Sequence, residues 1–116
     1  MLTLEDLKTR PDIVSSIDWE MTPQQAFEAY QLKSINAWKY RSLPEVSLFV
    51  IYVFKGQARL VLVSRTLKDT REIAEIQVPE QLLRSCVTSQ GGDNPARGQY
   101  PINESLRAWL KQELGL

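Results

Sequence analysis

The chain has 116 residues, 43% of them hydrophobic and 24% charged, and 14 basic and 14 acidic residues give a formal net charge of +0. These values are typical of one globular domain and argue against a disordered chain. The balanced charge argues against nucleic-acid binding, which usually needs a basic excess for phosphate contacts. The sequence contains no histidine, the commonest general base and metal ligand. We expect one domain over residues 1–116, with no cofactor and no metal.

The sequence carries no sign of secretion or of a membrane span. A single cysteine, Cys86, excludes an intrachain disulfide, and no Cys/His spacing predicts a zinc site. The segment Met1–Asp6 lacks the basic and apolar regions of a signal peptide. The longest apolar run, Leu48–Phe54, is too short to cross a bilayer as a helix. These features predict a soluble, cytoplasmic protein.

The first twenty residues predict a short helix followed by an apolar cluster. Thr3 resembles an N-cap, with Glu5 and Asp6 in the first turn. The helix should end before Pro11, because the residue before proline disfavours helical backbone. The cluster that follows has no assigned state and consists of Ile13, Val14, Ile17 and Trp19.

A stronger helix signal begins at residue 22. Thr22 is placed as an N-cap, Pro23 as the first helical residue, and Gln25 at the capping-box position. The helix should run to about residue 34. Periodicity is then lost up to residue 45, which predicts an irregular connector.

Residues 46–78 predict a three-stranded antiparallel meander. Two runs rich in β-branched and aromatic residues, 46–55 and 58–66, are separated by Gly56-Gln57, which is typical of a two-residue hairpin turn. A polar turn at 67–70 precedes a third alternating run at 71–78.

The C-terminal third predicts two helices. Pro79 opens the first, whose apolar face consists of Leu82, Leu83, Cys86 and Val87. Residues 89–99 are rich in Gly, Pro, Asn and Asp and predict a long loop. The last helix should run from Ile102 or Asn103 to Leu114, with Gly115 as its stop. The predicted fold class is therefore α+β: the meander, N-terminal helical segments, and two C-terminal helices.

If both turns of the meander are tight, each sheet face can be assigned its residues. One face is apolar throughout and must be covered by helices; it collects Leu48, Val50, Tyr52, Phe54, Val61, Val63, Ala74, Ile76 and Val78. The other collects Phe49, Ile51, Val53, Leu60, Leu62 and Ile73, with Glu75 and Gln77.

The second of these faces is too apolar to be left in water. A sheet with one wet face should alternate apolar and polar residues, which the first strand does not. Either the 13–19 cluster covers it, which we favour, or another chain does, as in a homodimer or a complex with a protein partner. The residues available to that partner would be Phe49, Ile51, Val53, Leu60 and Leu62.

The connector contains the best binding candidates. Trp38, Tyr40 and Arg41, with Arg97 of the loop, could stack bases or hold an anion. The same aromatic residues could equally fill the gap between helix and sheet, which is the simpler interpretation. Basic residues near the strand ends could extend the patch or guard the sheet edges; they are Arg59, Arg65 and Arg71.

Three further features favour structural roles over chemistry. The glycine-rich loop at 90–100 matches no phosphate-binding motif. Cys86 lies on an apolar helix face with no histidine to activate it. Asp18 and Glu20 flank Trp19 in a region where acidic cap residues are common. We assign no catalytic residue.

The segment Ile17–Ala26, together with Asn36 and Trp38, the Val78–Glu80 step and the closing Trp109–Lys111, resembles a family of small bacterial proteins of sulfate reducers. The resemblance implies a bacterial, cytoplasmic setting. It implies no activity and no functional residue.

Two functions are compatible with these features. The first is a small non-enzymatic interaction module that self-associates or docks to another protein. The second is a ligand- or nucleic-acid-binding domain that uses Trp38, Tyr40 and Arg41. Salt separates them, because nucleic-acid binding weakens as salt rises and apolar association persists.

Overall fold

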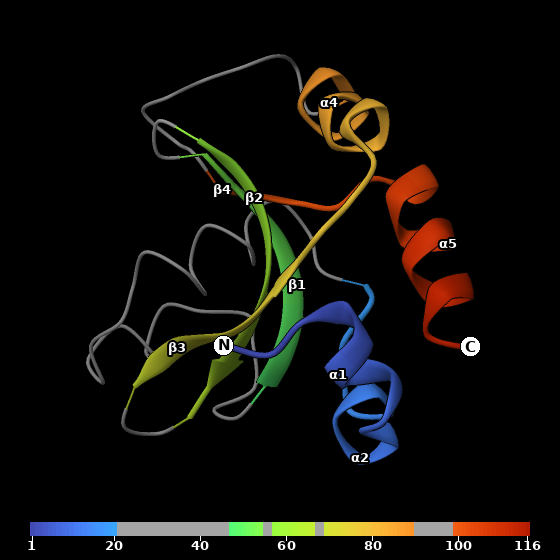
Figure 1. Cartoon of the computed structure of the whole chain (residues 1–116). Helices are drawn as coiled ribbons and strands as arrows, with labels where there is room; N and C mark the ends of the chain where they lie inside the picture. Colours follow the sequence, from blue (N-terminus) through green and yellow to red (C-terminus); the bar gives the residue numbers. More distant parts are fainter. Residues whose placement is uncertain (21–46, 55–56, 67–68, 90–98) are drawn as a thin grey trace.

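The computed structural model describes residues 1–20, 47–54, 57–66, 69–89 and 99–116 (Figure 1). The elements of this part, in chain order, are α1 (Leu4–Lys8), α2 (Pro11–Val14), β1 (Ser47–Phe54), β2 (Ala58–Arg65), β3 (Thr70–Ile76), α4 (Glu80–Ser89), β4 (Gln99–Pro101) and α5 (Glu104–Glu113). The helix predicted at 22–34 and the connector after it lie outside the described residues. Among the described helices, none is long and apolar enough to span a membrane.

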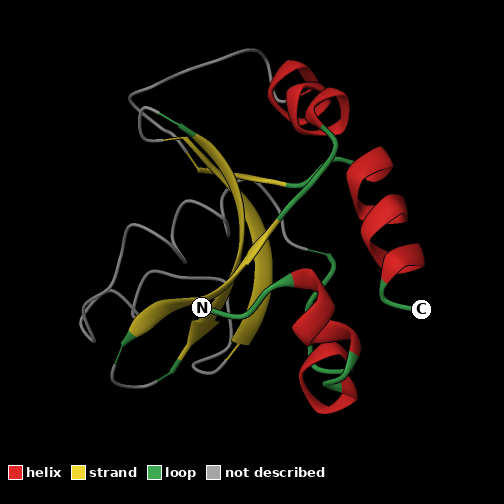
Figure 2. Ribbon diagram, in the orientation of Figure 1, coloured by secondary structure: helices red, strands yellow, loops and turns green. Residues whose placement is uncertain are grey.

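The meander is confirmed, and with it the α+β class. Strands β1, β2 and β3 pair antiparallel in sequence order. A short fourth strand, β4, pairs antiparallel with β1 and gives the sheet order β3-β2-β1-β4. It begins at Gln99, in the segment that the sequence predicts as loop. Figure 2 shows the described helices gathered on one side of this sheet.

The predicted assignment of β2 to the sheet faces is wrong. Phe54 pairs with Ala58, so three residues connect the strands where two were predicted. A register shift of one residue turns every side chain of a strand to the opposite face. Leu60 and Leu62 therefore lie opposite Tyr52 and Val50, and not beside Phe49 and Ile51.

Although β2 is turned over relative to the prediction, an irregularity in the β2–β3 pairing keeps Ala74 and Ile76 of β3 on the sheet face predicted for them. The pairing shifts by one residue between Leu62 and Val63, as at a β-bulge. Beyond the shift, Ala74 pairs with Leu62 and Ile76 with Leu60. Both β3 residues thus lie on the face predicted for them.

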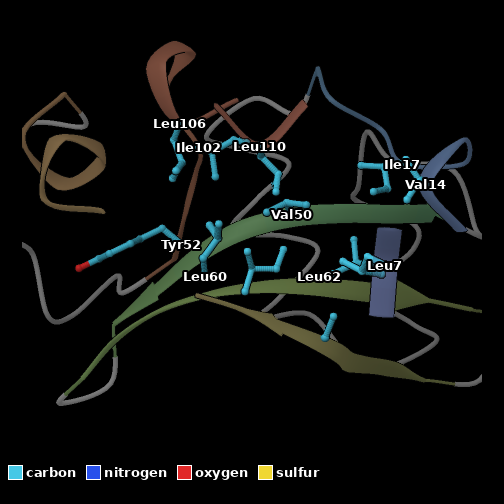
Figure 3. Packing of buried hydrophobic residues seen from close by; sticks show 12 residues of the cluster. Leu7, Val14, Ile17, Val50, Tyr52, Leu60, Leu62, Ile102, Leu106 and Leu110 are labelled. Carbon is cyan, nitrogen blue, oxygen red and sulfur yellow. The ribbon is translucent and has the colours of Figure 1, made fainter. Parts of the chain in front are cut away.

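The main core lies between the helices and the sheet face that carries Leu60 and Leu62 (Figure 3). We call this sheet face the first face; its buried strand residues are Val50, Tyr52, Leu60, Leu62, Ala74 and Ile76. The helices and the segments beside them contribute Leu7, Val14, Ile17, Ile102, Leu106 and Leu110. The predicted cover by the 13–19 cluster is therefore corrected: Val14 and Ile17, with half-buried Trp19, pack on the first face. Asp18 donates its N–H to Leu48 O at 2.7 Å, which ties the segment to the edge of β1.

The helix ends follow the predicted chemistry. The Thr3 hydroxyl accepts from Asp6 N, and the Asp6 carboxylate accepts from Thr3 N, which is a capping box. At α5, Asn103 is the N-cap and accepts from Leu106 N at 2.9 Å. Gly115 terminates α5 just beyond its C-cap, Leu114: its φ of 78° suits glycine, and the paired backbone hydrogen bonds are those of a Schellman motif.

The capping box should make the N-terminal helix sensitive to acid. Hydrogen bonding to Thr3, first to its backbone N–H and then to its side chain, lowers the pKa of the Asp6 carboxyl below its ordinary value. A carboxyl whose pKa is lower in the folded state stabilises the fold above its unfolded pKa, and this contribution is lost as pH falls through the folded pKa. We expect the Asp6→Asn variant to lose less stability than the wild type between about pH 5 and about pH 2.

Urea unfolding as a function of pH measures this difference. The matched control is Glu104→Gln, another exposed first-turn carboxylate, in α5. Equal acid sensitivity of Asp6→Asn and the wild type would contradict the assignment.

Candidate interaction surface

The opposite side of the sheet carries a separate apolar cluster, which we call the second face. It consists of Phe49, Ile51, Val53, Val61 and Val63, each 0% exposed in one copy of the chain. Every member comes from β1 or β2, and no described helix contributes a side chain to it. The described helices pack on the first face only.

The second face exists because β1 is apolar at consecutive positions. Val50 and Tyr52 point to the first face, while Phe49, Ile51 and Val53 point to the second. A strand that is apolar on both faces is typical of a sheet buried on both sides. Cross-strand pairs then complete the second face, with Phe49 opposite Val63 and Ile51 opposite Val61.

The second face has a charged border on its β3 side. Arg59 lies opposite Val53, and its guanidinium donates to Glu72 and, at 2.7 Å, to Glu75. Glu72 and then Glu75 raise the pKa of Arg59 above its ordinary value, so the arginine stays charged. The three side chains are partly exposed, so this ion cluster contributes little to stability.

Arg65 lies at the other end of the second face. It pairs with Ser47 on β1 and with Thr70 on β3, and it is 0% exposed. Among the described residues it is the largest fully buried side chain and the single buried charged one. The predicted role as an edge charge is therefore corrected. Arg65 lies two and four residues from Val63 and Val61 on the same strand, so its side chain points to the same buried second face.

The binding candidates chosen from the sequence cannot be placed together. Trp38, Tyr40, Arg41 and Arg97 all lie outside the described residues. The structure describes Arg71, which is 71% exposed at its side chain and 3.6 Å from Asp69. This is a surface ion pair, as expected of a charge near a strand end.

The acidic pair has structural partners. Asp18 accepts a hydrogen bond from Glu20 N at 2.9 Å, and Glu20 lies 3.4 Å from Arg107 of α5. Lys111, one turn further along α5, lies 5.4 Å from the centre of the Trp19 ring, in cation–π range. These contacts connect the N-terminal segment to α5.

Cys86 falls within α4, as predicted, and its side chain lies outside the described part.

A groove at the Gln57 end of β2 and β3 is too small for a typical ligand. Its volume is about 90 Å³, and it is lined by residues that include Arg59, Glu75, Val78 and Leu83. Ligand pockets usually enclose several hundred Å³. The charges in this groove also pair with each other.

The pKa shifts of the described groups follow from their hydrogen-bond and ion-pair partners. Partners within three residues lower the pKa of Asp6 and Asp12 and raise the pKa of Lys8 and Arg10, and Glu72 and Glu75 of β3 raise the pKa of Arg59. Each shift favours the charged form. A general acid or base needs the reverse, a pKa brought toward neutral pH.

The described part is therefore an α+β domain with helices on one sheet face and a separate apolar cluster on the other. Comparison of the chain with protein-family models, curated proteins and solved structures finds no match. The resemblance to small proteins of sulfate reducers stays a prediction.

Proposed function

We propose that the chain is a small, non-enzymatic interaction module that associates with a second copy of itself through the second face. The observation that carries the proposal is the composition of that face: five apolar side chains from two neighbouring strands, forming a cluster to which no described helix contributes a side chain. A two-layer α+β domain needs one buried sheet face for its core. A second buried face needs cover of its own, and we propose that another copy can supply it.

The second face is fully buried in one copy, so two copies can associate through it only by exchanging the contacts that cover it. Contacts that cover the second face within one copy are exchanged for equivalent contacts from another copy. Such exchange costs little, because the two sets of contacts are alike, and it is a common route to dimers.

A second copy suits the charge of the molecule. A formal net charge of +0 gives two copies no long-range repulsion. The border of the face carries both signs, with Arg59 between Glu72 and Glu75. Such a border can be self-complementary across a two-fold axis. The composition, with one cysteine, supports a cytoplasmic setting for this module.

Isotope-filtered NMR tests the proposal directly. In a mixture of labelled and unlabelled chains, we expect contacts between copies at the methyl groups of Val61 and Val63. Val50 is the internal control, because it is equally apolar, comparably buried at 4%, and on the first face. Contacts between copies at Val50 and not at Val61 would contradict the proposal.

Salt dependence provides a second check. Apolar association should persist at high salt, where exposed charge pairs are screened. Retention on nucleic acid that is lost as salt rises would favour the ligand- or nucleic-acid-binding alternative.

A further inference from the structure

The outer edge of β3 is a strand edge that the chain itself partly closes. The sheet order places β3 at one end, so within the described part of the chain one side of its backbone has no neighbouring strand. Free edges offer N–H and C=O groups to any extended segment, and proteins usually block them.

Leu2 blocks this edge as a strand of one residue. Its N–H donates to Ile73 O at 2.9 Å, and its C=O accepts from Glu75 N at 3.1 Å. These bonds form a parallel bridge in which Leu2 lies beside Ala74. In Figure 1 the N-terminus lies against β3. The Leu2 side chain is half-buried against the first-face core.

The N-terminal segment follows the edge of β3 only briefly, because the capping box ends the extended backbone after Leu2. Thr3 N donates to the Asp6 carboxylate at 2.9 Å, which turns the chain into α1. On the other side, Met1 is 72% exposed. One residue therefore makes both edge bonds, and a longer extended segment could replace it.

We propose that the outer edge of β3 is a peptide-binding site, and that Leu2 occupies it as a weak internal competitor. The partner that fits is an extended segment in parallel orientation, with a leucine-sized side chain beside Ala74. The next residue of that segment would lie beside Glu75, whose side chain is 38% exposed. A basic residue at that position would join Arg59, which already donates to Glu75 at 2.7 Å. Peptides that add a strand to a sheet edge gain affinity from such backbone bonds and specificity from alternate side chains.

This inference concerns the sheet edge and is independent of association through the second face. Its test uses the whole chain, labelled with ¹⁵N, and the peptide acetyl-Ser-Leu-Lys-Val-amide as the probe. The Leu2→Pro variant removes the N–H that bonds to Ile73 O and the side chain that anchors Leu2. We expect the probe to bind this variant about tenfold more tightly than the wild type, since a competing hydrogen bond and apolar contact are gone.

The location of binding is read from the amide signals of Ile73 and Glu75. Met1→Ala is the matched control and should leave affinity unchanged, because its side chain is exposed. A probe with proline in place of leucine should not bind. Leu2→Gly keeps the backbone bonds and removes the anchor, so it should show a smaller gain and serves if Leu2→Pro does not fold. Equal affinity of wild type and the folded Leu2 variant, no binding at all, or shifts confined to other elements would overturn the proposal.

Discussion

Replacing Arg65 with alanine is expected to lower the free energy of unfolding by about 3–5 kcal/mol. The side chain is 0% exposed at one end of the second face. A buried guanidinium is stable only where polar or charged groups compensate it. Alanine would leave those groups uncompensated and would also open a cavity at a large buried position.

Two further variants separate charge from packing. Arg65→Met keeps much of the volume and removes the charge, so its loss should be smaller than that of alanine. Arg65→Lys keeps the charge but not the planar fork, so it should restore the wild-type stability incompletely. Urea unfolding of each variant provides the comparison.

The matched control is Arg71→Ala, on the next strand. Its side chain is 71% exposed and its ion pair with Asp69 lies at the surface. We expect a change within about 0.5 kcal/mol. A similar effect of both substitutions would show that Arg65 is not buried as the structure describes.

Replacing Leu106 with alanine is expected to cost about 2–5 kcal/mol. Leu106 is 0% exposed on α5 and packs against the first face (Figure 3). Alanine is the best helix former, so the helix itself is not weakened. The loss comes from apolar contact and from the cavity left between α5 and the sheet.

Leu116→Ala is the control for this loss, because it makes the same chemical change at a residue that is 60% exposed. Its effect should stay within about 0.5 kcal/mol. If Leu106→Ala were equally mild, α5 would not be part of the core that the structure describes. Thermal unfolding of the two variants measures the difference.

The helix ends and strands could be predicted because their signals are local. Thr3 caps α1 and Gly115 ends α5 through hydrogen bonds within a few residues. The runs of β-branched and aromatic residues in the meander likewise specify strands through neighbouring side chains. The fourth strand was missed because a three-residue segment in a loop-like sequence carries no such pattern, and its pairing with β1 depends on tertiary contact.

The faces of the sheet could not be predicted because they depend on the length of one connection. Phe54 pairs with Ala58, a register set by three intervening residues, and this moved Leu60 and Leu62 to the first face. Arg65 shares a buried face with Val61 and Val63 in either register, so the register did not decide its burial. Its parity with Val61 and Val63 was visible in the sequence, but a strand-end arginine has an ordinary surface explanation. The binding candidates Trp38, Tyr40, Arg41 and Arg97 lie outside the described residues.

Sedimentation velocity of the wild-type chain across the micromolar to millimolar range tests the central claim, association through the second face. Self-association predicts a sedimentation coefficient that rises with protein concentration and persists at high salt, because apolar contact is not screened. One monomeric species at every concentration would contradict the claim.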